Sequence, residues 1–183
     1  MSLGKKAMGI GQVFIFIMAA LTFALIMIFG YKAIAGFLNS GEQVEFVQFK
    51  TGLEKSVKQI YTEYGSVRIK DFNIPEKYEQ VCFVDMDYPP AGINNGMDEL
   101  CAEDAFACDM WEQARDEGGY ESVDANVFLK PSAGVPIKVF KISIVDIETE
   151  QGVGYYCTDI KSGQFTIMIE GKGDRTEISA APK

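Results

Sequence analysis

Four cysteines are the residues of this chain with the most reactive side chains: Cys82, Cys101, Cys108 and Cys157. Cysteine thiols form disulfides in an oxidising compartment, or they hold zinc where their spacing suits a tetrahedral site. The chain contains no C-x-x-C pair and no histidine, so the common zinc patterns are missing. These observations favour disulfides over a metal centre.

Four thiols allow three pairings. Cys82 and Cys157 both fall in apolar, strand-like segments and could join two positions of a sheet. Cys101 and Cys108 are seven residues apart, and an unbroken helix would separate their Cα atoms by roughly 10 Å, too far for a disulfide. Their pairing therefore requires a helix break near residues 105–107. We expect the pairs Cys82–Cys157 and Cys101–Cys108.

Carboxylates form the second concentration of reactive groups. Twelve of them lie between Asp85 and Asp124, against one basic residue, Arg115. Carboxylate and amide oxygens are calcium ligands, although the spacing here does not match an EF-hand loop. The weak calcium candidates are Asp85, Asp87, Asp98 and Glu99, with the amides of Asn94 and Asn95 beside them. A solvated acidic face is the favoured interpretation, because charge runs are usually that, and a surface for a basic partner is the other.

Patterns of catalytic residues are absent from the sequence. There is no G-x-S-x-G, no P-loop and no histidine to act as a general base. We therefore expect no enzyme and no cofactor, with calcium as the single exception considered. All 26 acidic residues follow residue 41, and this excess of negative charge argues against nucleic acid as a partner.

An apolar segment near the N-terminus determines the compartment. Residues 13–30 carry no charge and would form a helix of roughly 27 Å, enough to cross the hydrocarbon core of a bilayer. Lys5 and Lys6 precede it, so the positive-inside rule predicts a cytoplasmic N-terminus and an extracytoplasmic C-terminal domain. A signal peptide cleaved after residues 33–35 is the alternative, disfavoured because the apolar run exceeds the usual 7–15 residues.

The sequence predicts four regions. A short basic cytoplasmic leader spans residues 1–12, a transmembrane helix 13–38, an amphipathic helix 39–65 and a β-rich extracytoplasmic domain 66–183. Ser40 and Gln43 form a capping box, so we expect a break near residues 39–41 and a new helix ending at Gly65. Its apolar stripe is expected to pack on the domain's own sheet. The residues of this stripe are Phe46, Phe49, Leu53, Val57, Ile60 and Tyr64.

Short strand patterns dominate the C-terminal region. Strands are predicted at residues 66–72, 80–86, 123–129 and 137–145, and a broken helix at 98–117. Residues 154–171 read as a hairpin whose loop contains Gly163 and whose strands place Cys157 opposite Ile167. We expect an α+β fold in which the helices precede a sandwich-like antiparallel head.

The N-terminal third resembles the type IV pilin superfamily, particularly archaeal pilin-like proteins. The residues that carry the resemblance are Lys5-Lys6, Gly9-Ile10-Gly11 and Gln12, which opens the apolar helix. The resemblance implies removal of the leader after Gly11, or less favourably after Gly9, and self-association through the hydrophobic helix. The assembly residues would then be Val13, Phe14, Phe16, Leu21, Phe23, Leu25 and Phe29.

Two functions are therefore expected from different classes. The first is a structural, single-pass membrane protein of pilin-like character that assembles into a filament at the cell surface. The second is a permanently anchored binding or accessory subunit, which uses residues 85–124 to hold calcium or a basic partner.

Overall fold

A computed structural model describes residues 10–88, 97–149 and 151–182 of the chain. It divides into two compact units, Met1–Val44 and Glu45–Lys183, which are treated separately below. Lys5, Lys6, Gly9, Asn94 and Asn95 lie outside the described residues. The α+β class is confirmed: an N-terminal apolar helix is followed by a region built mainly of strands.

Helix α1 (Ile10–Ile60) is continuous, so the predicted break at residues 39–41 and the new helix start at Ser40 are wrong. Serine and glycine are only weakly unfavourable inside a helix, at most about 1 kcal/mol each, and the segment contains no proline. The predicted end at Gly65 is also wrong. Gly65 has a φ of 75° and its N–H donates to the carbonyl of Gly171, so it belongs to the connection between α1 and the first strand.

The Glu45–Lys183 unit contains two sheets. The five-stranded sheet has the order β1-β7-β8-β4-β5 and the three-stranded sheet the order β3-β2-β6. The strands are β1 (Val67–Asn73), β2 (Gln80–Val84), β3 (Val127–Lys130), β4 (Ile142–Asp146), β5 (Gln151–Val153), β6 (Tyr155–Asp159), β7 (Gln164–Gly171) and β8 (Thr176–Ala180). All pairs are antiparallel except β4 and β8, which run parallel, so the expectation of an antiparallel head is corrected at that pair.

The predicted hairpin at 154–171 is wrong in its pairing. The turn is present, with Ser162 and Gly163 at φ values of 51° and 70°. However, β6 pairs with β2 in one sheet, whereas β7 pairs with β1 and β8 in the other. Cys157 therefore lies opposite Cys82, not Ile167. The chain changes sheets at this turn because the N–H of Ile160 donates to Glu79 O and that of Ile74 to Gly163 O.

The main core is formed by the last part of α1 and by strands of both sheets. Four residues of the predicted stripe, Phe49, Leu53, Val57 and Ile60, are buried; Phe46 is partly buried, and the prediction is wrong for Tyr64, which follows α1 and is exposed. Phe49 makes edge contacts with Phe72 of β1 and Phe165 of β7. Each such side chain contributes roughly 1.5–3 kcal/mol on burial, so this part of α1 is a structural element of the second unit.

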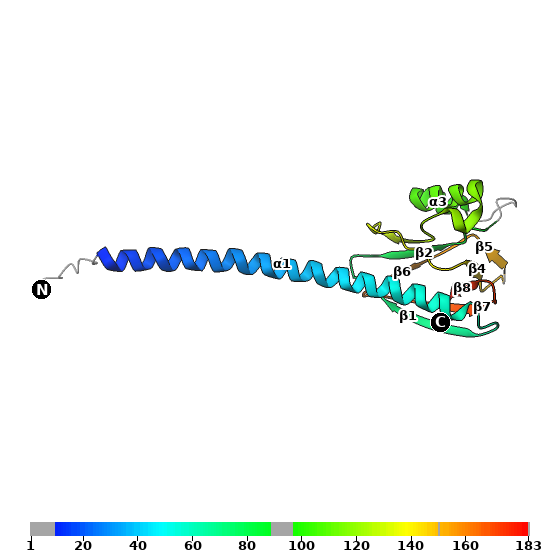
Figure 1. Ribbon diagram of the computed structural model, residues 1–183, viewed down its shortest axis with the longest axis horizontal. Helices are drawn as coiled ribbons and strands as arrows, with labels where there is room; N and C mark the ends of the chain where they lie inside the picture. Colours follow the sequence, from blue (N-terminus) through cyan, green and yellow to red (C-terminus); the bar gives the residue numbers. More distant parts are fainter. Residues whose placement is uncertain (1–9, 89–96, 150, 183) are drawn as a thin grey trace, which may run out of the picture. The chain divides into compact units, whose positions relative to one another are not determined.

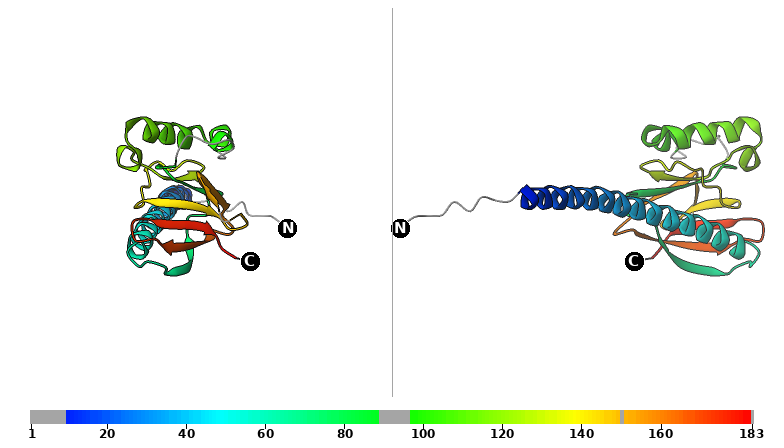
Figure 2. Two further views of the ribbon diagram at one scale, coloured as in Figure 1. Left: turned by 90° about the vertical axis from the view of Figure 1, so that its right-hand side faces the viewer. Right: turned by 60° about the vertical axis from the view of Figure 1, so that its left-hand side comes forward.

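A second core lies on the other face of the β3-β2-β6 sheet. Helices α2 (Met97–Glu103) and α3 (Ala105–Glu117) and the short helix η1 (Gly119–Ser122) cover it with Leu100, Ala107 and Trp111. Figure 2 shows these helices as one layer at the side of the sheets. The helical chain breaks at Asp104, whose carboxylate caps α3 by accepting from the Ala107 N–H at 3.0 Å.

Gly171 is the position at which a small change should most disturb this packing. A Cβ at this residue would lie 2.5 Å from Glu63 O and closer still to Ile60 O, at the end of α1. We expect Gly171→Ala to lower the free energy of unfolding by about 3 kcal/mol, because rigid backbone must move. Gly52→Ala, in α1 with open space around it, is the matched control and should raise stability by about 0.5–1 kcal/mol. Urea unfolding of both variants measures the contrast, and equal effects would contradict the clash.

Candidate functional site

The first candidate site is the exposed apolar surface of α1. Residues Val13–Ile34 form a segment with the length and composition of a membrane-spanning helix or of a signal sequence, and none of it is buried. At 1.5 Å per residue it extends roughly 33 Å. The seven predicted assembly residues, all exposed, are Val13, Phe14, Phe16, Leu21, Phe23, Leu25 and Phe29. This surface needs an apolar environment.

Thr22 is the one conventional polar side chain within residues 13–30 of this surface. Its hydroxyl lies 3.0 Å from Met18 O and 2.9 Å from Ala19 O, so it donates to the backbone of its own helix. A hydroxyl satisfied in this way needs no water or partner side chain. Residues 13–30 are therefore compatible with lipid, and Lys32 lies just beyond them.

Gly11 and Gln12, the predicted processing junction, lie in the first turn of α1. The structure does not describe their side chains, so it neither supports nor opposes cleavage at this bond.

Both disulfides have the pairing that we expected. Cys82 of β2 and Cys157 of β6 are directly opposite in the sheet, with Cα atoms 4.0 Å apart. Cys101 of α2 and Cys108 of α3 have Cα atoms 4.7 Å apart, because the chain turns at Asp104 between the two helices. The Cys82–Cys157 bond joins two strands, whereas the Cys101–Cys108 bond joins two consecutive helices.

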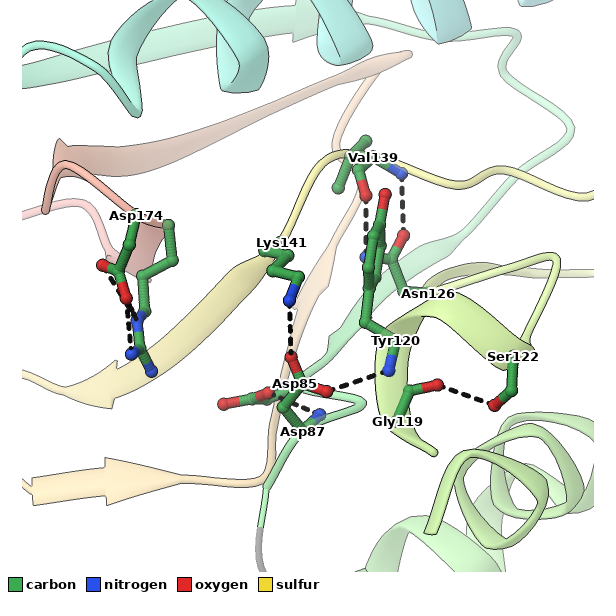
Figure 3. A network of polar contacts seen from close by, with 10 residues as sticks. Asp85, Asp87, Gly119, Tyr120, Ser122, Asn126, Val139, Lys141 and Asp174 are labelled. Atoms are coloured by element: carbon green, nitrogen blue, oxygen red, sulfur yellow. Dashed lines mark hydrogen bonds and ion pairs between the residues drawn. The ribbon is translucent and has the colours of Figure 1, made fainter. Parts of the chain in front are cut away.

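The four calcium candidates do not form one site. Asp85 and Asp87 follow β2, whereas Asp98 and Glu99 lie on α2, and no three acidic or cysteine side chains among the described residues are grouped to hold an ion. The carboxylates of Asp85 and Asp87 instead accept hydrogen bonds from backbone N–H groups. Asp85 accepts from the Asp87 N–H at 3.0 Å, and Asp87 accepts from the Tyr120 N–H at 2.9 Å (Figure 3).

These two carboxylates belong to a polar network that sequence reasoning did not identify. Lys141 points at Asp87, with its ammonium 4.0 Å from Oδ2, and Lys138 lies 4.3 Å from the centre of the Tyr120 ring. Gly119 permits the close approach, because a Cβ there would overlap Asp87 Oδ1 and its φ is 85°. The Gly118-Gly119 pair is the feature of the sequence that could have indicated this close approach. The network fastens η1 to the loop after β2.

Asp85 is the most strongly perturbed carboxyl group among the described residues. It is 8 % exposed, and burial raises its pKa from 3.8 to about 6. The hydrogen bond from Asp87 N–H and the charge of Arg175 lower the pKa, while the charge of Asp87 raises it. Burial is the largest effect, so it outweighs the two that lower the pKa. The ionised form is thus unfavourable in the folded protein.

Asp85→Asn should stabilise the protein at neutral pH. Between about pH 4 and pH 6 the folded protein binds more protons than the unfolded chain, so the wild-type free energy of unfolding falls as pH rises. A pKa change from 3.8 to about 6 corresponds to about 3 kcal/mol. The variant should gain this amount above pH 7 and almost nothing at pH 4, as measured by urea unfolding. The exposed Asp124→Asn is the control, and a pH-independent gain would contradict the burial argument.

Two surface cavities lie beside the acidic helical layer. One of about 820 Å³ is lined by Asp98, Glu99, Glu103, Asp146 and Glu148 together with Tyr155 and Tyr156. Glu103 is paired with Lys130 at 3.6 Å, and Glu99 accepts from the hydroxyl of Tyr155 at 3.4 Å. The other, of about 400 Å³, is an apolar groove beside Phe106 and Val135. The first cavity is acidic and suits a basic partner, and the second suits an apolar side chain.

Comparisons with family models, with curated proteins and with solved structures found no match to this chain. The likeness of the N-terminal third to type IV pilins therefore rests on the residues quoted above.

Proposed function

We propose that this chain is a structural, single-pass membrane protein of pilin-like character, which associates with further copies through the apolar surface of α1. The observation that carries the proposal is the exposure of every large apolar side chain in Val13–Ile34. Fifteen such side chains, each worth roughly 1.5–3 kcal/mol on burial, must be covered by lipid or by other helices.

The proposed topology places the N-terminus in the cytoplasm and the sandwich-like unit of two sheets outside. Lys5 and Lys6 on one side and the acidic unit on the other support this orientation. Two disulfides support an extracytoplasmic location for the second unit, because such bonds persist in oxidising compartments. After removal of the leader, the same apolar helix would become the centre of a filament.

Intact mass and N-terminal sequencing of the native protein test the proposal. We expect a chain that begins at Gln12, in particles that electron microscopy shows as filaments. A variant with Gly11→Leu should retain the leader and remain in the membrane as single subunits. A mature, membrane-extracted protein that still begins at Met1 would contradict the pilin-like function and favour a permanent anchor.

A permanently anchored binding subunit is the second candidate, favoured by the acidic cavity of about 820 Å³. Because its carboxylates are spread over α2, β4 and the following turn, they suit an extended basic partner more than a single ion. Residues 45–183 should bind a lysine-rich peptide, with an affinity that falls as salt rises. Asp98→Asn combined with Glu99→Gln should weaken this binding, and Asp71→Asn with Glu76→Gln is the matched control. Absence of binding at low salt would exclude this function.

A further inference from the structure

Strand β6 is an edge strand whose open side carries unpaired backbone groups. It pairs with β2 and with no other strand of its sheet. At the end of this pair, the N–H of Ile160 donates to Glu79 O. Because bonded and non-bonded pairs alternate along an antiparallel ladder, Tyr155, Cys157 and Asp159 direct their backbone N–H and C=O groups away from β2. Within the described part of the chain, no backbone hydrogen bond joins these outward groups to another segment.

The Cys82–Cys157 pair agrees with this alternation and holds the edge in place. Its Cα atoms are 4.0 Å apart, which is closer to the spacing of a non-bonded pair, about 4.5 Å, than to that of a bonded pair, about 5.5 Å. The backbone of Cys157 is therefore directed to the open side. Since the disulfide also ties β6 covalently to β2, the edge is formed before any partner arrives, and binding requires little ordering of the protein.

The cavity of about 820 Å³ described above lies along this open edge. Tyr155 and Cys157 line it from the face of β6 that packs on the helical layer, and Tyr156 lines it from the face that packs on the main core. Successive side chains of a strand point to opposite faces, so a cavity bordered by both faces lies at the edge of the strand. Figure 1 shows the β3-β2-β6 sheet between the helical layer at α3 and the strands β7 and β1 of the other sheet. The cavity offers space for a further strand beside β6.

The walls of the cavity are acidic. No lysine or arginine among the described residues lines it, and one of its carboxylates, Glu103, is neutralised by Lys130 from outside. The carboxylates that line it are Asp98, Glu99, Glu103, Asp146 and Glu148. They belong to α2 on one side and to β4 and the residues after it on the other. A segment that enters this cavity must therefore carry positive charge.

We propose that an extended basic segment of a partner protein binds in this cavity by adding to β6 as a further strand of the β3-β2-β6 sheet. The outward N–H and C=O groups of Tyr155, Cys157 and Asp159 pair with the segment, and its lysine or arginine side chains at alternate positions face the carboxylates of α2. This inference rests on the second candidate function, a binding subunit, and specifies how its partner is held. Backbone pairing selects an extended chain, and the acidic wall selects basic side chains at every second position.

Amide hydrogen exchange of the full-length protein in detergent micelles, measured by NMR, tests the pairing. The probe is a peptide of alternating lysine and valine residues. We expect the N–H groups of Tyr155, Cys157 and Asp159 to exchange about tenfold more slowly, or slower still, with the peptide bound, because they then donate to its carbonyl groups. The N–H groups of Tyr156 and Thr158 face β2 and should be protected with and without the peptide.

Strand β1 supplies the control, because it is an open edge of the other sheet. The N–H of Gly171 donates to Ser66 O, so by the same alternation Ile69 and Asp71 direct their N–H groups away from β7. Exchange at these two amides should not change when the peptide binds. Equal slowing at both edges would show strand pairing without selection by charge and would overturn the assignment to the acidic cavity.

Alternate N-methylation of the peptide is the second arm. One peptide carries methyl groups on the backbone nitrogens of its lysines and the other on those of its valines, so the charge is the same and a different set of N–H groups is removed. In an added strand of either direction one set faces β6. One methylated peptide should therefore bind about tenfold more weakly than the other, or weaker still, because its bonds to β6 are lost. Equal affinities would contradict strand addition.

The outcomes separate this proposal from the function on which it rests. Salt-sensitive binding of the unmodified peptide without slower exchange at Tyr155, Cys157 and Asp159 overturns the strand addition and leaves the binding of a basic partner standing. Absence of binding at low salt overturns both.

Discussion

Removal of residues 1–44 is expected to convert the protein from a membrane-bound or detergent-requiring form into a soluble, monomeric domain. The remaining chain keeps both hydrophobic cores, because Phe49, Leu53, Val57 and Ile60 all follow the boundary at Glu45. It loses the fifteen exposed apolar side chains of Val13–Ile34. Transfer of each of them from water to an apolar environment is worth on the order of 2 kcal/mol, so together they supply tens of kcal/mol for membrane binding. The measurement is sedimentation after membrane fractionation, with circular dichroism to verify the fold.

A shorter deletion is the control for this experiment. A chain that lacks only residues 1–9 retains the whole apolar segment and should stay in the membrane fraction. If residues 45–183 still sediment with membranes, the second unit has a membrane-binding surface of its own and α1 is not the sole anchor.

Loss of the Cys82–Cys157 disulfide should destabilise the domain by about 4 kcal/mol. The two cysteines are separated by 75 residues, and a cross-link over a loop of that length removes much conformational entropy from the unfolded chain. The double variant Cys82→Ala/Cys157→Ala should therefore unfold at much lower urea concentration than wild type. Wild-type protein with both disulfides intact provides the reference unfolding curve.

The Cys101–Cys108 disulfide offers a matched comparison in the same domain. Its separation is 7 residues, so the same entropic argument gives about 2 kcal/mol for Cys101→Ala/Cys108→Ala. The contrast of about 2 kcal/mol between the two double variants is the informative quantity. Equal losses, or a larger loss for the shorter loop, would show that local packing around the bonds outweighs loop length.

Local patterns in the sequence predicted what depends on neighbouring residues. The uninterrupted apolar run identified the N-terminal helix, and the spacing of Phe49, Leu53, Val57 and Ile60 identified its buried stripe. Helix geometry made the expected pairing of Cys101 with Cys108 depend on a helix break, and the structure has that break at Asp104. The capping box at Ser40 was a false signal, because a helix that can continue needs no cap.

Features that depend on distant partners were not predictable in this way. The residues of 154–171 alternate as a hairpin should, yet each strand gains better burial by joining a different sheet. Asn126 is a second case: just before β3, its buried side-chain amide donates to Val139 O at 3.1 Å and accepts from Val139 N–H at 2.8 Å, a pairing with a distant segment that its sequence neighbours do not indicate. Likewise, nothing near Asp85 in the sequence indicates that the charge of Arg175 lowers the pKa of its carboxyl group.

The pairing of β1 with β7, and of β4 with β8, has a consequence for biogenesis. The end of α1 packs against strands that are synthesised long after it, including Ile167, Ile169 and Ile178 in the same core. Until those strands are synthesised, the emerging chain lacks the partners of its first helix and first strand. The main core of this unit is therefore complete only after β8 has been synthesised, and we expect the apolar side chains from Phe49 to Phe83 to be exposed to chaperones until then.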